Sequence, residues 1–294
     1  MNCYNGEKYL YESINSVINQ NFKNWELIFF DNCSTDKSKK ICKEFNEKRI
    51  KYFKSTTKIK LGLARRKALA KARGEFTAFL DVDDIWNKNK LSKQLQYFNN
   101  PKVGFTISNS IFFNENKKNL LYESKKKFGK KVFYDLIENY FISFDTIIIK
   151  TKFMKKLDHM FDQKFNIIHD MDLIIRLSAI CEMKYVPFAL SKWRMSTESD
   201  SYNKFKKIIY EKKIFIKKIS KDNENNITFL NSKIKYMDIL HRQEILYLLS
   251  KKRYVKLFIL INKLKVNLKN FFLILLIFSP FKKYIYNNIL NLKY

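Results

Sequence analysis

The chain has 294 residues, of which 46% are hydrophobic and 16% aromatic, and this composition excludes an intrinsically disordered protein. The length allows one domain of about 200 residues and an appendage. A formal net charge of +30 invites a nucleic-acid partner, but the accompanying richness in Asn, Ile, Tyr and Phe indicates general compositional drift towards Lys. The four cysteines fit neither a zinc site nor a disulfide framework, and the first residues lack the features of a secretory signal. We therefore expect a reducing cytoplasm.

Strands and helices alternate over the first 80 residues. Apolar residues recur at helical spacing in the first segment, and short apolar runs end in polar loops further on. In chain order we expect a helix over 9–20, a strand over 25–30, a helix capped from 34–36, a strand over 49–53, a helix over 63–73 closed by Gly74, and a strand over 76–80. This alternation predicts an α/β, Rossmann-like, mostly parallel sheet flanked by helices, with ligand loops at the carboxyl ends of the strands.

A cluster of carboxylates follows the last of these strands. Asp81, Asp83 and Asp84 crowd one strand end, and a divalent cation is the simplest way to keep such groups ionised together. Mg²⁺ fills its remaining positions with water and substrate phosphates, so the cluster indicates phosphate chemistry. A solvated loop or a helix cap is the alternative interpretation.

The pattern loosens beyond residue 86. We expect a helix over 91–98, strands over 103–113 and 144–150, and a helix over 169–180. Asp170 lies in the first turn of that last helix, where an acid is favoured electrostatically. It is therefore either a cap or a functional carboxylate.

Residues 204–294 form a separate basic region that we expect to be helical. They contain 21 Lys or Arg against 5 Asp or Glu. The apolar run 271–281 is too short to span a bilayer, but its flanking lysines suit the headgroup region of an anionic membrane. Packing against a domain or a second subunit is the alternative.

Several short motifs follow one another in a fixed order. They are Cys3-Tyr4-Asn5, Ser16 to Gln20, Trp25 to Ile28, Asp31 to Asp36, Gly62 to Arg65, Ala72 to Glu75 and Phe79 to Asp84. This order resembles the family 2 glycosyltransferases of bacterial surface-polysaccharide type, which are inverting enzymes of the GT-A fold. The resemblance spans residues 3–94 almost without gaps, thins to 169–173 and 193–194, and does not cover the tail.

The resemblance implies a site for a nucleotide sugar. Tyr4 would stack on the base, with a core aromatic residue as the alternative. Asp31 and Asn32 stand where the family usually has two acids, the second of which meets the uracil ring. Arg65 would lie near the nucleotide, with a solvated helix residue as the alternative. The donor half is then about 1–100, the acceptor half about 101–203, and the appendage 204–294.

Asp81 and Asp83 match the family's Asp-x-Asp pair, which implies a Mg²⁺ or Mn²⁺ cofactor. Asp83 would bind the cation directly, Asp81 would reach the ribose or the metal, and Asp84 would orient both. Asp170 matches the general base, with Asp172 as the next candidate.

Three departures from the family pattern are visible. His169 replaces the acid before the base, and its partial protonation would lower the pKa of Asp170. Ser196 stands where the family often has a histidine. The chain also begins almost on Tyr4, so either the true start lies earlier or a central strand is short.

We therefore predict an inverting transferase that moves a sugar from a nucleoside diphosphate sugar, UDP-linked, to a hydroxyl of a lipid-linked or surface glycan. It would lie peripherally on the cytoplasmic face of the membrane, without a nucleic-acid partner. One alternative is a nucleotidyltransferase of similar fold, although the opening offers only Gly6 for a phosphate loop. Another is a polycationic protein with a degenerate transferase domain that binds membranes or nucleic acid.

Overall fold

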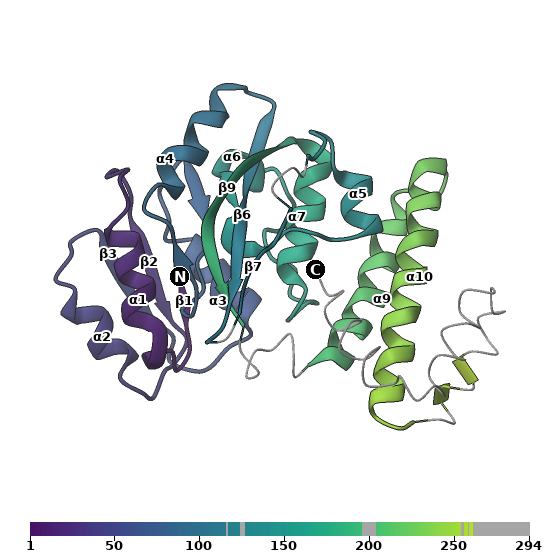
Figure 1. Ribbon diagram of the computed structural model, residues 1–294, viewed down its shortest axis with the longest axis horizontal. Coiled ribbons are helices and arrows are strands. Elements are labelled where there is room, and N and C mark those ends of the chain that lie inside the picture. The colour runs from purple at the N-terminus through teal and green to yellow at the C-terminus, as the bar shows by residue number, and fades with distance from the viewer. Residues whose placement is uncertain (116, 124–126, 196–203, 254–255, 258, 261–294) are drawn as a thin grey trace. The chain divides into compact units, whose positions relative to one another are not determined.

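The computed structural model describes residues 1–115, 117–123, 127–195, 204–253, 256–257 and 259–260 (Figure 1). The chain divides into two compact units, Met1–Asn203 and Lys204–Tyr294. The first unit contains two sheets, and the described part of the second unit is helical.

The first sheet is parallel throughout and has the strand order β1-β2-β3. The central strand β2 is buried along its whole length, and Phe29 from it stacks on Tyr52 of β3. The apolar face of α1 packs into the same core, as its helical spacing predicts. The elements are β1 (Asn2–Cys3), α1 (Glu7–Ile18), β2 (Leu27–Asp31), α2 (Ser38–Glu44), β3 (Ile50–Lys54) and α3 (Leu61–Leu69).

The second sheet is mixed and has the order β4-β8-β6-β9-β5, with β7 paired to β6. Among its strand pairs in the described residues, β6 and β9 alone are parallel, and they run side by side (Figure 1). The predicted α/β class is confirmed, but parallel pairing dominates only the first sheet, because regular strand-helix alternation ends after β4. The elements are β4 (Phe76–Ala78), β5 (Ile85–Trp86), α4 (Lys90–Leu95), β6 (Val103–Phe113), β7 (Lys118–Leu120), α5 (Phe133–Glu138), β8 (Ile148–Lys150), α6 (Thr151–Met154), α7 (His169–Ile180) and β9 (Glu182–Arg194), with 3₁₀ turns at Gln96–Asn99 and Phe144–Thr146.

Two local expectations were wrong. The helix expected over 63–73 ends at Leu69, so Gly74 is not its C-terminal cap, and the backbone continues through i→i+3 bonds to Ala72. Residues Phe144–Thr146 of the expected strand 144–150 form a 3₁₀ turn instead. The buried Asp145 carboxylate accepts hydrogen bonds from Ser110 and Ser143, and these bonds favour the turn over a strand.

The second unit consists of α9 (Phe205–Lys221) and α10 (Ile227–Ser250), which pack side by side (Figure 1). Asn226 caps α10 by accepting a hydrogen bond from the Phe229 amide. The expected interfacial segment 271–281 lies outside the described residues. Within the residues that the structure describes, none of the helices combines the length and apolar character that a bilayer crossing requires.

Candidate active site

The acidic loop between β4 and β5 presents two of its three carboxylates. Asp81 and Asp83 are partly exposed, whereas Asp84 is buried and accepts a hydrogen bond from the Arg194 amide at 3.0 Å. Burial and the nearby Asp145 hold the pKa of Asp84 well above the usual carboxyl range. Asp84 therefore fixes the loop from inside.

Two arginines hold this loop from opposite parts of the sequence. Arg65 on α3 is buried and donates from Nη2 to Asp81 Oδ1 at 2.6 Å. Arg194, at the end of β9, donates from Nε to the Asp83 carbonyl at 3.0 Å and from Nη2 to Glu12 at 2.6 Å. The loop is thus tied to α3 and to the end of β9. Ser196, two residues further on, lies outside the described residues.

The chemistry of Asp83 fits a divalent cation. Burial, followed by repulsion from Asp81, raises the pKa of Asp83 to about 6. Among the described residues, no side chain donates a hydrogen bond to the Asp83 carboxylate. A bound cation would relieve both penalties, because it favours the ionised form of both acids.

The same arginine reaches the start of α7. Arg65 Nη1 lies 2.6 Å from His169 Nε2, and His169 Nδ1 lies 3.1 Å from the Asn166 carbonyl. Nδ1 must donate to that carbonyl, so Nε2 is left to accept from Arg65 in a neutral imidazole. Burial and Arg65 lower the pKa of His169 well below its usual value. The expected partial protonation of His169 is therefore wrong.

Asp170 follows His169 in the first turn of α7. Burial raises its pKa, while Arg65 opposes the rise and Asp81 adds to it. The expectation that His169 lowers the pKa of Asp170 is wrong for the same reason, since the cation acting on Asp170 is Arg65. Asp170 and Asp81 thus lie within electrostatic reach of each other and of one guanidinium.

Tyr140 is a candidate that the sequence did not reveal. Its buried hydroxyl has no hydrogen-bond partner among the described residues, and it interacts electrostatically with Asp170 and Arg65. A buried hydroxyl without a partner is costly, so a bound substrate group is a natural partner. No motif marks Tyr140, which is one of 17 tyrosines in the chain.

The loop after β1 carries an accessible aromatic ring. Tyr4 is 42% exposed, and the Lys58 ammonium lies 3.4 Å from its ring centroid. The loop is fixed by Asn5, whose φ is 52° and whose Oδ1 accepts from the Thr35 amide at 2.9 Å. Tyr4 can therefore offer its face to a flat ligand without moving the backbone.

The side chains of Asp31 and Asn32 are buried and are not exposed to a ligand at the surface. Asp31 accepts hydrogen bonds from the Tyr52 hydroxyl at 2.5 Å and from the Ser34 amide at 2.7 Å. Asn32 pairs with the backbone of Ile59, donating at 2.8 Å and accepting at 3.0 Å. Both side chains fix the shape of the loop that follows β2.

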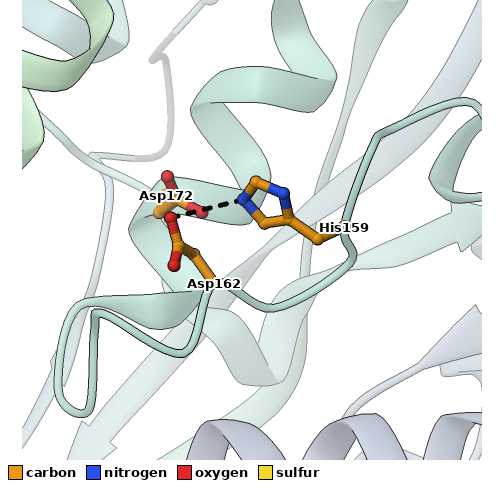
Figure 2. Close-up of side chains that lie close together, drawn as sticks. All are labelled: His159, Asp162 and Asp172. Carbon is orange, nitrogen blue, oxygen red and sulfur yellow. Dashed lines mark ion pairs between the residues drawn. The ribbon is translucent and has the colours of Figure 1, made fainter.

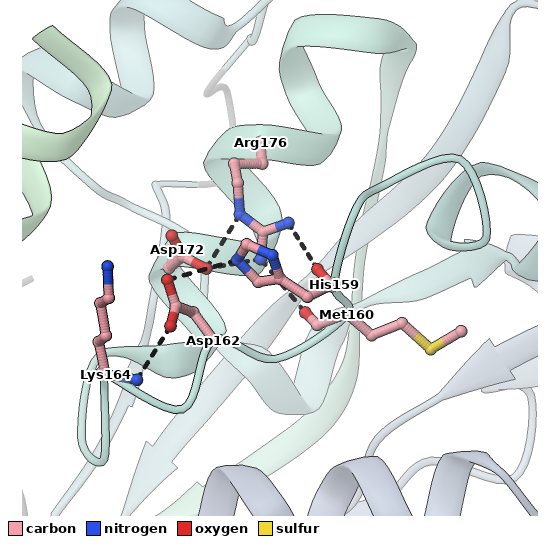
Figure 3. Close-up of polar contacts among 6 residues, drawn as sticks. All are labelled: His159, Met160, Asp162, Lys164, Asp172 and Arg176. Atoms are coloured by element: carbon pink, nitrogen blue, oxygen red, sulfur yellow. Dashed lines mark hydrogen bonds and ion pairs between the residues drawn. The ribbon is translucent and has the colours of Figure 1, made fainter. Parts of the chain in front are cut away.

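A second group of polar side chains lies beside α7. His159, Asp162 and Asp172 each place one possible ligand atom within 4.8 Å of the others (Figure 2). However, Arg176 donates to Asp172 Oδ2 at 2.5 and 3.0 Å, so this carboxylate already has a cation (Figure 3). Arg176 also donates to the carbonyls of His159 and Met160. The group is an ion-pair cluster that anchors α7, and Asp172 is unsuitable as a base.

The sheets, the acidic loop and the two arginines define an α/β protein with a candidate site for a phosphorylated ligand. A family model described as "Glycosyl transferase family 2" matches residues 1–158, more than half of the chain. The chain belongs to this family, and it is therefore a glycosyltransferase, as the resemblance predicted.

Individual relatives agree with this assignment. The chain is 32% identical over 213 residues to the Escherichia coli protein "UDP-Glc:alpha-D-GlcNAc-diphosphoundecaprenol beta-1,3-glucosyltransferase WfgD", covering 71% of this chain and 80% of that one. Staphylococcus aureus TarS 1–349 in complex with UDP-GlcNAc has a TM-score of 0.65 at 21% identity, over 82% of this chain and 70% of that one.

The mannosyltransferase PcManGT from Pyrobaculum calidifontis, in complex with GDP-Man and Mn²⁺, has a TM-score of 0.62 at 14% identity. The match covers 82% of this chain and 68% of the PcManGT chain. These structural likenesses confirm the predicted GT-A fold.

Proposed function

We propose that this glycosyltransferase moves a sugar from a nucleoside diphosphate sugar, with UDP as the nucleotide, to a hydroxyl of a lipid-linked precursor of a surface glycan. The printed name of WfgD, at 32% identity, specifies a UDP-sugar donor and a lipid diphosphate acceptor for that relative. The observation that carries the proposal is the double contact of Arg65, at 2.6 Å to both Asp81 and His169. It joins the candidate donor acids to the helix that bears the candidate base.

On the donor side, Tyr4 stacks on the base while Asp31 and Asn32 hold the loop beneath it. Arg65 lies beside the nucleotide. Asp81 and Asp83 hold a Mg²⁺ or Mn²⁺ ion, which when bound supplies positive charge for the departing diphosphate. The exposed ring of Tyr4 supports the first role, and the crowded carboxylates support the last.

On the acceptor side, Asp170 takes the proton of the attacking hydroxyl. The acceptor oxygen forms a bond to the anomeric carbon as the bond from that carbon to the diphosphate oxygen breaks, and attack from the opposite face inverts the configuration. A carboxylate whose pKa is raised by burial is a stronger base than an exposed one.

The molecule's charge supports a peripheral position on the inner face of the cell membrane. Residues 204–294 carry 21 basic against 5 acidic residues, and lysines flank the apolar run 271–281. We assign residues 1–203 to catalysis, with the donor half over about 1–100, and 204–294 to the membrane. Membership in a sugar-transferring family favours this function over nucleotidyl transfer and over a binding protein with a degenerate catalytic domain.

The test is a screen of donor hydrolysis and transfer across nucleotide sugars with Mn²⁺. We expect Asp83→Ala and Asp170→Asn to fold normally and to lose at least about 10²-fold in turnover, the scale of a general-base contribution. Asp158→Asn, at an exposed position of the same unit, is the matched control and should keep full turnover. Full transfer by Asp170→Asn would contradict the assigned base.

A further inference from the structure

The second unit contains a hollow of about 630 Å³ between α9 and α10. Its walls include the apolar or aromatic side chains of Ile209, Tyr210, Tyr247 and Leu248. Among the described residues, the rest of its lining consists of six basic side chains and one acidic one, which are Lys204, Lys206, Lys207, Lys213, Arg253, Lys256 and Glu244. We call the four apolar or aromatic residues the floor of the hollow and its charged residues the rim.

The charges of the rim are only partly compensated within the structure. Within the described lining, Glu244 accepts a hydrogen bond from Lys213 at 2.6 Å, and Lys207 lies 3.9 Å from Glu211 of the same helix. Lys206, Arg253 and Lys256 are exposed. A complementary ligand is thus anionic at the rim.

The apolar floor distinguishes between classes of anion. A nucleic acid would satisfy the rim but would gain nothing from Ile209 and Leu248, whereas a phospholipid offers a phosphate and a hydrocarbon chain together. The chain's own residues 261–294 are an unsuitable occupant, since they contain six lysines and no acid. Like charges would oppose their binding at a cationic rim.

We propose that this hollow binds the phosphate headgroup of an anionic membrane phospholipid, with the start of the hydrocarbon chain against Tyr210 and Leu248. The proposal rests on the membrane association proposed above and specifies where that association has its phosphate site. Tyr210 is 64% exposed, so its ring can meet a lipid without rearrangement of the helices.

The experiment measures binding of the full chain to vesicles of phosphatidylcholine with and without phosphatidylglycerol. The double variant Lys206→Glu, Lys256→Glu should lose at least about tenfold in affinity for the anionic vesicles, given the typical contribution of a lysine near a charged surface. Its matched control is Lys217→Glu, Lys221→Glu, which changes the net charge equally on exposed residues of α9 outside the hollow. Equal losses in the two variants would overturn the site.

Two further arms separate the ligand classes. A short-chain phosphatidylglycerol, monomeric in solution, should bind the unaltered chain more tightly than inorganic phosphate does, and Tyr210→Ala should remove that difference. Equal binding of both ligands would overturn the lipid assignment. Loss of single-stranded RNA binding in the rim variant, with vesicle binding unchanged, would also overturn it and indicate a nucleic-acid site.

Measuring donor hydrolysis distinguishes a failure of the phospholipid site from a failure of the proposed function. The rim variant should hydrolyse the donor as the unaltered chain does, because none of the altered residues belongs to the first unit. Absence of hydrolysis from the unaltered chain would count against the enzyme assignment alone. Absence of vesicle binding by the unaltered chain would count against membrane association as a whole.

Discussion

At the scale of single residues, Arg65 organises the candidate site. Its guanidinium contacts both Asp81 and His169, and His169 lies 104 residues further along the chain. The same guanidinium lies over the Phe144 ring. A buried arginine is stable only when its donors are satisfied, so these contacts fix the acidic loop and the start of α7 relative to each other. Asp170 follows His169 in the first turn of α7, so the same contacts also position Asp170.

The hydroxyl of Tyr140 should matter for acceptor use. Because it is buried without a partner near Asp170, we expect Tyr140→Phe to keep or slightly improve stability. The same change should raise the acceptor KM or lower kcat by about five- to tenfold, the loss of one hydrogen bond. Steady-state kinetics with varied acceptor would measure this. Tyr134→Phe, on the neighbouring helix α5, is the control, and unchanged kinetics for Tyr140→Phe would exclude a substrate contact.

The fully buried Lys90 should make stability depend on pH. Burial lowers its pKa from 10.5 to about 7, although its ammonium donates to Gln94 and to the Thr146 carbonyl. Above pH about 7 the unfolded chain binds more protons at this residue than the folded chain, so the free energy of unfolding should rise with pH by up to about 1.4 kcal/mol per unit. Below that pH the lysine is charged in both states and adds no slope.

Denaturant titrations from pH about 7 to about 7.8, below the ordinary thiol pKa of about 8.5, would measure this slope. Lys90→Met should flatten it, whereas Lys88→Met, at an exposed position two residues earlier, should not. An unchanged slope in Lys90→Met would show that the buried ammonium is not responsible.

At the scale of elements, α7 depends on its ion-pair cluster. Asp172 is fully buried and its charge is compensated by Arg176, which also holds the carbonyls of His159 and Met160 (Figure 3). Arg176→Met leaves that charge uncompensated and should lower the free energy of unfolding by about 3–5 kcal/mol. The double variant Asp172→Asn, Arg176→Met should recover part of the loss. Equilibrium denaturation of both variants tests this, and an equal loss in both would assign the effect to packing.

Periodicity predicts the regular elements well, as the helices 9–20 and 169–180 and the strand 103–113 show. It fails where tertiary contacts decide the conformation. The strand β9 was not predicted, because its side chains mix charged, aromatic and apolar types along both faces. Phe144–Thr146 turns because Asp145 bonds to Ser110, a partner 35 residues away that no local pattern reveals.

The family motifs singled out Asp81, Asp83, Arg65 and Asp170, and the structure places these side chains in one electrostatic environment. What the sequence could not supply was the protonation of His169, because burial and the contact with Arg65 decide it. The sequence could not reveal Tyr140 either, because Tyr140 stands out only through its buried hydroxyl, which has no hydrogen-bond partner among the described residues.

At the scale of the whole molecule, positive charge is unevenly distributed along the chain. The net charge of the chain is +30, and residues 204–294 contribute more than half of it in less than a third of the length. The acids proposed to take part in catalysis all lie before Asn203, within the first compact unit. Sugar transfer and membrane attachment should therefore be separable by truncation.

We expect a chain truncated after Asn203 to retain donor hydrolysis and to lose binding to anionic vesicles. Both predictions follow from the placement of the acidic loop, Arg65 and Asp170 in one unit with its own core, while more than half of the net positive charge lies in the other. Hydrolysis by the truncated chain, compared with the same truncation carrying Asp83→Ala, measures the first. Vesicle sedimentation over a salt series measures the second, since electrostatic attachment weakens as salt rises. A truncated chain that folds cooperatively but hydrolyses no donor would mean that residues 204–294 take part in catalysis.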